Sequence, residues 1–104
     1  MSTYENDTED GVATKDRVQI KRPPMFKVLL HNDDYTTMEF VILVLETVFN
    51  KNTTVASQIM MDVHKEGIGV AGVYTRDVAE TKVALVHDMA RTNQHPLKCS
   101  MEQA

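Results

Sequence analysis

FKVLLHNDDYTTMEFV, residues 26–41, decides the fold of this chain, because one kind of secondary structure gives way to another inside it. Its first part, Phe26–His31, is short and apolar and predicts a strand that is buried on at least one face. The polar cluster Asn32–Tyr35 then predicts a turn. Thr36 and Glu39 match the T-x-x-E capping box, so we expect a helix to begin at Thr36.

Two amphipathic helices are predicted downstream of this turn. The first has an apolar stripe with helical spacing, formed by Val41, Val44, Leu45, Val48 and Phe49. Residues 50–52 break the pattern, and Asn52 or Thr53 is suited to cap the second helix. The second helix should end at Gly67, a typical residue after a helix C-terminus. Its apolar face consists of Val55, Ala56, Ile59, Met60 and Val63.

The remaining sequence predicts a strand, a helix and a strand. Ile68–Tyr74 is apolar and contains glycines, which favours a buried strand. Thr75 is suited to cap a third helix that runs to about Asn93, with an apolar seam formed by Ala79, Val83, Val86 and Ala90. After Pro96, the residues Leu97, Cys99 and Met101 alternate with polar residues, as in a half-buried strand. The order β-α-α-β-α-β predicts an α/β (α+β) two-layer sandwich, with a three-stranded antiparallel sheet packed against three helices on one face.

The N-terminal part of the chain has a different composition. Residues 1–22 are rich in Thr, Asp, Glu, Lys and Arg without a clear period, which is typical of a segment that cannot bury enough apolar surface to become ordered. Pro23 and Pro24 end it with a stiff extended step. We therefore expect a mobile extension over residues 1–24 and a core over residues 25–104. The extension is either an inert leader or a tether that another protein engages.

Composition and charge exclude several classes of function. The 104 residues suffice for one domain, and no apolar run is long enough to span a membrane or to form a signal peptide. The formal net charge of −4 disfavours binding to nucleic acid or anionic membranes and favours a cationic partner. The single cysteine, Cys99, suits a reducing cytoplasm. No spacing typical of a metal or cofactor site is present, so we expect neither.

Two places could carry chemistry. Asn32, Asp33 and Asp34 offer several acceptor oxygens in a small volume at a strand-to-helix junction, although the same residues are common in plain turns. His64 shares a helix face with Met60 and Val63. It could bind a ligand, or it could only interact favourably with the carbonyls at the end of its helix.

These motifs resemble the ClpS family, the bacterial adaptors of the N-end rule that feed substrates to the AAA+ protease ClpAP. The resemblance runs from about Pro23 to the C-terminus. It is carried by LLHNDDYTTMEFV (residues 29–41), MMDVH (residues 60–64), GVYTRDVAETKVA (residues 72–84) and HPLKC (residues 95–99). It implies a non-enzymatic adaptor that binds the free N-terminal Leu, Phe, Tyr or Trp of N-degron substrates and delivers them to the ATPase ClpA. We further expect a monomer.

The resemblance also implies a role for individual residues. The substrate's α-amino group would be held by Asn32, Asp33, Asp34 and His64. The pocket for the first side chain would be formed by Thr36, Met38, Val41, Met60, Val63 and Leu97. Docking on the N-terminal domain of ClpA would involve the region of Asp77 and Lys82.

The chain departs from the family pattern at two of these places. Many relatives have proline where this chain has Thr37, and we expect the loss of proline at the first helical position to loosen the pocket wall. Relatives commonly have glutamate where this chain has Asp77. Neither change removes a group that would contact the substrate.

Elementary chemistry supports these assignments. An α-ammonium group presents three donors and a positive charge, so its receptor must offer acceptors, at least one of them anionic. Methionines such as Met38 and Met60 adapt to both branched and aromatic side chains. Two alternatives remain at this point: a module that binds an internal segment of another protein, and a small hydrolase that uses Asp33, Asp34 and His64.

Overall fold

A computed structural model describes residues 22–104, so residues 1–21 of the expected extension lie outside the described part of the chain. The elements are β2 (Met25–His31), α1 (Met38–Thr47), α2 (Thr53–Glu66), β3 (Ile68–Thr75), α3 (Arg76–Thr92) and β4 (Lys98–Gln103). The predicted order β-α-α-β-α-β is therefore confirmed, and every element lies within a few residues of its expected place.

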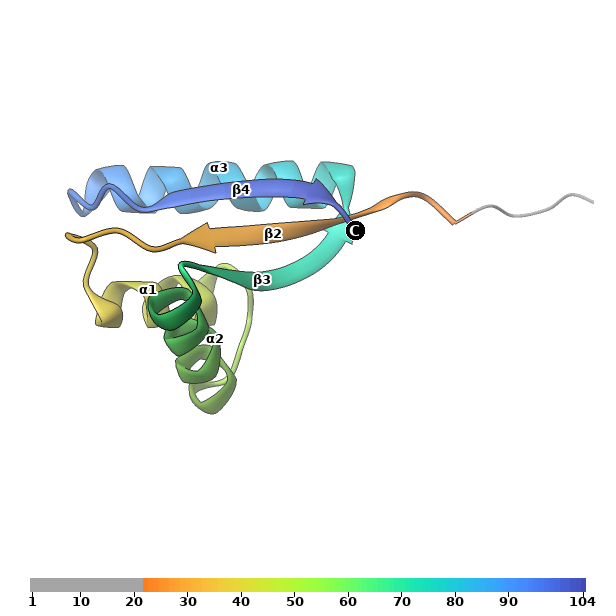
Figure 1. Cartoon of the computed structure of the whole chain (residues 1–104). Helices are drawn as coiled ribbons and strands as arrows, with labels where there is room; N and C mark the ends of the chain where they lie inside the picture. Colours follow the sequence, from red (N-terminus) through yellow and green to blue (C-terminus); the bar gives the residue numbers. More distant parts are fainter. Residues whose placement is uncertain (1–21) are drawn as a thin grey trace, which may run out of the picture.

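The sheet has the strand order β3-β2-β4, and both pairings are antiparallel. In Figure 1, β2 runs between β4 and β3, α3 follows the length of β4, and α1 and α2 lie together on the side of β3. Val28 pairs with Gly72 whereas Leu29 pairs with Val70, so Ala71 is an extra residue in β3 and forms a bulge. The predicted three-stranded antiparallel sheet is confirmed.

The helices pack on a single face of this sheet. Val28 and Leu30 of β2 are fully buried and share one core cluster with the apolar faces of all three helices. Leu29, which points to the opposite face, is not part of that cluster. The predicted two-layer sandwich follows from this arrangement. None of the helices in residues 22–104 is long and apolar enough to cross a membrane.

The start of α1 differs from the prediction. The N-cap is Thr37, whose hydroxyl accepts a hydrogen bond from the Phe40 N–H at 3.1 Å, and the helix begins at Met38. Thr36 instead belongs to the turn before the helix, where its N–H and hydroxyl both donate to Asp33. The predicted capping box at Thr36 and Glu39 is wrong by one residue. Position 37 is also the cap rather than the expected first helical position, so the Thr37 hydroxyl contributes a capping bond.

The ends of α2 and α3 follow the sequence signals closely. The side chain of Asn52, rather than Thr53, caps α2 by accepting from the Val55 N–H at 2.9 Å. Gly67 ends α2 with a φ of 87°, a left-handed conformation that glycine adopts without strain. Thr75 occupies the N-cap position of α3, although its side chain makes no capping hydrogen bond.

The expectation that β3 is a buried strand is correct for one face only, since Gly69 and Ala71 are buried but the other face is exposed. Ile68, Val70 and Val73 are 40%, 42% and 46% exposed. β3 lies at the edge of the sheet, and these side chains lie on the face opposite the core cluster. An apolar run therefore predicted the strand but not which of its faces is covered.

Candidate functional site

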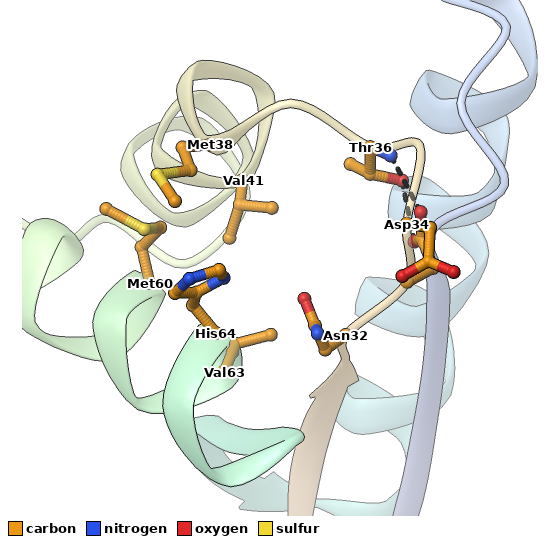
Figure 2. Close-up of a pocket in the computed structure, with 9 residues that line it drawn as sticks. Asn32, Asp34, Thr36, Met38, Val41, Met60, Val63 and His64 are labelled. Carbon is orange, nitrogen blue, oxygen red and sulfur yellow. Dashed lines mark hydrogen bonds between the residues drawn. The ribbon is translucent and has the colours of Figure 1, made fainter.

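A cavity of about 280 Å³ opens where the end of β2 meets α1 and α2. Figure 2 shows it between the loop that follows β2 and the facing side chains of the two helices. The structure brings together nine of the ten residues that were predicted for the amine and side-chain sites. These are Asn32, Asp33, Asp34, Thr36, Met38, Val41, Met60, Val63 and His64. The role of each toward a ligand stays a prediction.

The polar end of the cavity is formed by two segments that a hydrogen bond joins. The backbone N–H of Asn32 donates to the Gly67 carbonyl at 2.9 Å, so the loop after β2 is tied to the end of α2. His64 lies in the last turn of the same helix. As Figure 2 shows, the Asn32 amide and the His64 ring are both directed into the cavity. The hydrogen bond between Asn32 and Gly67 therefore holds the loop after β2 close to the turn of α2 that carries His64.

Asp34 and Asp33 differ in how their carboxylates are used. Asp34 is exposed, and among the described residues its carboxylate has no hydrogen-bond partner. The Asp33 carboxylate accepts from the N–H groups of Tyr35 and Thr36 at 2.8 and 2.7 Å through one oxygen. Its other oxygen accepts from the Thr36 hydroxyl at 2.7 Å (dashed lines at Thr36 in Figure 2).

These bonds change the acidity of Asp33. Burial acts to raise the pKa of its carboxyl, but the hydrogen bonds from Thr36 and Tyr35, together with the nearby His95, outweigh burial and lower that pKa below the ordinary value of 3.8. The carboxylate form of Asp33, with its bonds to the loop, therefore persists at neutral and mildly acidic pH.

The apolar wall of the cavity comes from the facing sides of α1 and α2. Val41, Met60 and Val63 are buried members of the core cluster, whereas Met38 is 44% exposed at the cavity's edge. Figure 2 shows the two methionine side chains next to each other. A flexible and partly exposed side chain over a packed floor can adapt to ligands of different shape.

Leu97 is the one predicted pocket residue that the structure does not place in the cavity lining. It is buried at 4% exposure and belongs to the core cluster just before β4. Its predicted contact with a ligand would require the cavity to extend deeper than it does in this structure.

Two residues that support the cavity had no predicted role. A Cβ atom on Gly69 would lie 2.6 Å from Cγ2 of Val63, so this glycine lets β3 approach the cavity wall closely. The ring of His95 stacks on Phe40 of α1 with 4.4 Å between ring centroids. The glycine within the apolar strand could have indicated the close approach of β3 to Val63. Nothing in the local sequence indicates the contact between His95 and Phe40.

The predicted docking residues lie on α3 in a separate cavity of about 250 Å³. It is lined by Asp77, Val78, Thr81, Lys82 and Leu85. The Lys82 ammonium donates to the Val48 carbonyl at 2.7 Å and lies 5.1 Å from the centroid of the Tyr74 ring. Lys82 therefore already stabilises the packing of α3 against the end of α1, while Asp77 is exposed in the first turn of α3.

The hydrolase alternative gains no support from the geometry. Within residues 22–104, no three His, Cys, Asp or Glu side chains lie close enough to hold a metal ion together. Asp33, which that alternative uses for acid–base chemistry, is engaged in three hydrogen bonds to its own loop. Cys99 is buried among apolar side chains, and burial raises the pKa of its thiol to about 12.

The fold has a counterpart among solved structures. The structure of Agrobacterium tumefaciens ClpS2 bound to L-phenylalaninamide matches with a TM-score of 0.77 and 40% sequence identity. The match covers 80% of this chain and 100% of that one. The fold thus places this chain in one structural class with a small protein whose structure was solved with an amino-acid amide bound.

Sequence comparison narrows this class to one family. The family model "ATP-dependent Clp protease adaptor protein ClpS" matches residues 21–100. The ClpS adapter of Desulfatibacillum aliphaticivorans is 57% identical over 98% of both chains, and that of Ruegeria sp. is 55% identical over 99% of this chain and 92% of its own. The chain belongs to the ClpS family of Clp protease adaptors.

Proposed function

We propose that this chain is a non-enzymatic N-degron adaptor that binds the free N-terminal Leu, Phe, Tyr or Trp of a substrate and delivers it to ClpA of the ClpAP protease. One observation carries the proposal: acceptor groups of Asn32, Asp34 and His64 adjoin an apolar wall in a single cavity. A free N-terminal residue presents a cationic donor group and a side chain from neighbouring atoms, so it matches both parts at once.

The polar end suits an α-ammonium group. Asp34 offers an anionic acceptor without a competing partner among the described residues, and Asn32 offers an amide oxygen. The neutral ring of His64 adds an acceptor nitrogen when its other nitrogen carries the proton. Each charge-assisted hydrogen bond contributes about 1.5–3 kcal/mol.

The apolar end suits a Leu or aromatic side chain. Burying one against Val41, Met60 and Val63 contributes about 1.5–3 kcal/mol. The ligand of the related ClpS2 structure, L-phenylalaninamide, has a free α-amine and a phenyl side chain, which supports the same assignment here. β-branched Ile and Val should bind less well, because branching at Cβ collides with the cavity mouth while χ1 is too stiff to avoid it.

Delivery requires a second surface, and α3 is the candidate. Asp77 together with the exposed Val78 and Leu85 surrounds the second cavity. Lys82 contributes its aliphatic stem, since its ammonium is bound to Val48. An apolar groove with an acidic end is suited to dock on the N-terminal domain of ClpA.

The central test compares two peptides that differ only at the α-amine. A fluorescent peptide with a free N-terminal Phe should bind with an affinity on the order of micromolar. Its Nα-acetylated form should bind about 100-fold or more weakly, because acetylation removes the charge and two donors. Equal binding of the two peptides would favour recognition of an internal segment instead.

Delivery is tested by adding the chain to ClpAP with a reporter protein that begins with Phe or with Ile. Only the Phe reporter should be degraded faster.

A further inference from the structure

Asp33 is the one acidic residue of the cavity whose carboxylate is already occupied. One of its oxygens accepts two backbone N–H groups and the other accepts a hydroxyl, all at 2.7–2.8 Å and all from Tyr35 and Thr36. A carboxylate has about four acceptor positions, so little capacity is left for an incoming ammonium group. Its neighbour Asp34 has no such partner among residues 22–104.

The bonds of Asp33 fix the chain at the entry to α1. They hold residues 33–36 in a compact turn, and the next residue, Thr37, caps the helix. α1 then carries Met38 and Val41 into the cavity wall. Asp33 therefore lies, with its three hydrogen bonds, between the loop that contains Asn32 and Asp34 and the helix that forms part of the apolar wall.

A second contact holds the same helix entry from outside. His95, in the loop after α3, stacks on Phe40 in the first turn of α1 with 4.4 Å between ring centroids. The backbone N–H of His95 donates to the Ala90 carbonyl at 2.8 Å, which ties that loop to the end of α3. The first turn of α1, which directly follows the turn made by Asp33, is thus packed against a loop that is itself tied to the end of α3.

We propose that Asp33 is a positioning residue that shapes the amine-binding loop and the start of α1 through Thr36, whereas Asp34 supplies the negative charge that the amine contacts. This inference rests on the proposed function, since it assigns different roles to the two acidic residues of that site. Substitution can distinguish the two roles, because positioning depends on acceptor oxygens and contact with the amine depends on negative charge. Asparagine keeps an acceptor oxygen for the loop's N–H groups but has no charge, while alanine removes both.

The experiment measures the affinity of a fluorescent peptide with a free N-terminal Phe by anisotropy for four variants. For the positioning residue, Asp33→Asn should bind within about threefold of the unaltered chain, and Asp33→Ala should bind about tenfold or more weakly. For the matched control, Asp34→Asn and Asp34→Ala should both bind about tenfold or more weakly, because either change removes the charge. Circular dichroism and urea unfolding establish that each variant is folded.

The outcomes separate the inference from the function on which it rests. Equal losses in Asp33→Asn and Asp33→Ala would show that the charge of Asp33 is used directly and would overturn the inference. Unaltered affinity in Asp33→Ala would overturn it as well. If Asp33→Ala fails to fold, the Asn variant still decides between the two roles. If the unaltered chain binds free and acetylated peptides equally, the proposed function itself fails, whatever the variants do.

Discussion

At the scale of single residues, the cavity lining combines side chains of the core cluster with side chains that lie outside it. Val41 and Val63 belong to the core cluster and line the cavity with their remaining surface. His64 lines the cavity but is exposed and lies outside that cluster. Substitution of His64 should therefore affect binding and stability to very different extents.

The variant His64→Ala is expected to lower the affinity for a peptide with a free N-terminal Phe by about tenfold or more, because an acceptor of the ammonium group is lost. The free energy of unfolding in urea should change by less than about 1 kcal/mol. Lys65→Ala is the matched control, since Lys65 is exposed in the same turn of α2 but does not line the cavity. Unchanged affinity in His64→Ala would mean that His64 only interacts with the carbonyls at the end of α2.

At the scale of elements, short-range competition decides where α1 begins. Thr36 and Thr37 are both suitable caps by residue type, but Asp33 accepts hydrogen bonds from both donors of Thr36. Thr37 is left to accept from Phe40. The sequence predicts the existence of this helix and its apolar stripe, because these depend on spacing alone. The capping residue depends instead on which of the two adjacent threonine side chains is directed toward Asp33 and which toward the first turn of α1.

Thr37→Ala is expected to lower the free energy of unfolding by about 1 kcal/mol, the usual cost of losing an N-cap. Thr53→Ala should cost less than about 0.5 kcal/mol, since Thr53 begins α2 without capping it and its exposed hydroxyl only donates to Glu46. Urea unfolding of the two variants and the unaltered chain gives both values. Equal costs would mean that the Thr37 hydroxyl contributes nothing beyond an ordinary surface contact.

The free energy of unfolding should depend on pH through His31, which lies in β2 and pairs with Lys98 of β4. Nε2 of His31 lies 2.6 Å from the Ser100 hydroxyl, and burial together with the neighbouring Lys98 lowers the pKa of the His31 side chain below 6.5. As pH falls through that value, the unfolded chain takes up a proton before the folded chain does, so folding stability is lost.

Urea unfolding at pH about 7.5 and about 5.5 should therefore give a smaller free energy at the lower pH. The variant His31→Gln should show less of this decrease, because the other histidines are retained and only the contribution of His31 is removed. A variant with the same decrease as the unaltered chain would assign the pH dependence to those other histidines.

At the scale of the whole molecule, the apolar stripes and the order of elements follow from the sequence, whereas long-range contacts do not. The exposed face of β3 depends on its place at the sheet edge, and the His95–Phe40 contact joins segments far apart in the chain. For the cavity, residue types alone left Asn32–Asp34 as either a turn or a set of acceptors. In the structure Asp33 forms the turn and Asn32 lines the cavity, whereas the use of these residues as acceptors for a ligand stays a prediction.

The buried thiol of Cys99 should report on opening of the entire domain. It is 3% exposed with a pKa of about 12, so a thiol reagent at neutral pH should react only when the chain opens. If opening is global, a bound N-terminal Phe peptide at about 100 times its Kd should slow labelling by about 100-fold. Labelling that is equally fast with and without peptide would mean that β4 detaches locally while the cavity stays intact.

The pairing of β2 with both β3 and β4 has a consequence for a chain that is still being synthesised. The central strand emerges first among the described elements, but its second neighbour, β4, emerges last. The two segments that meet at the polar end of the cavity are likewise far apart in the sequence. Both α1 and α2 lie between Asn32 and Gly67, whose carbonyl accepts from the Asn32 N–H. Such non-local closure is slow relative to helix formation. The cavity should therefore be complete in a nascent chain only when nearly all of the chain has left the ribosome, and the proposed binding should begin no earlier.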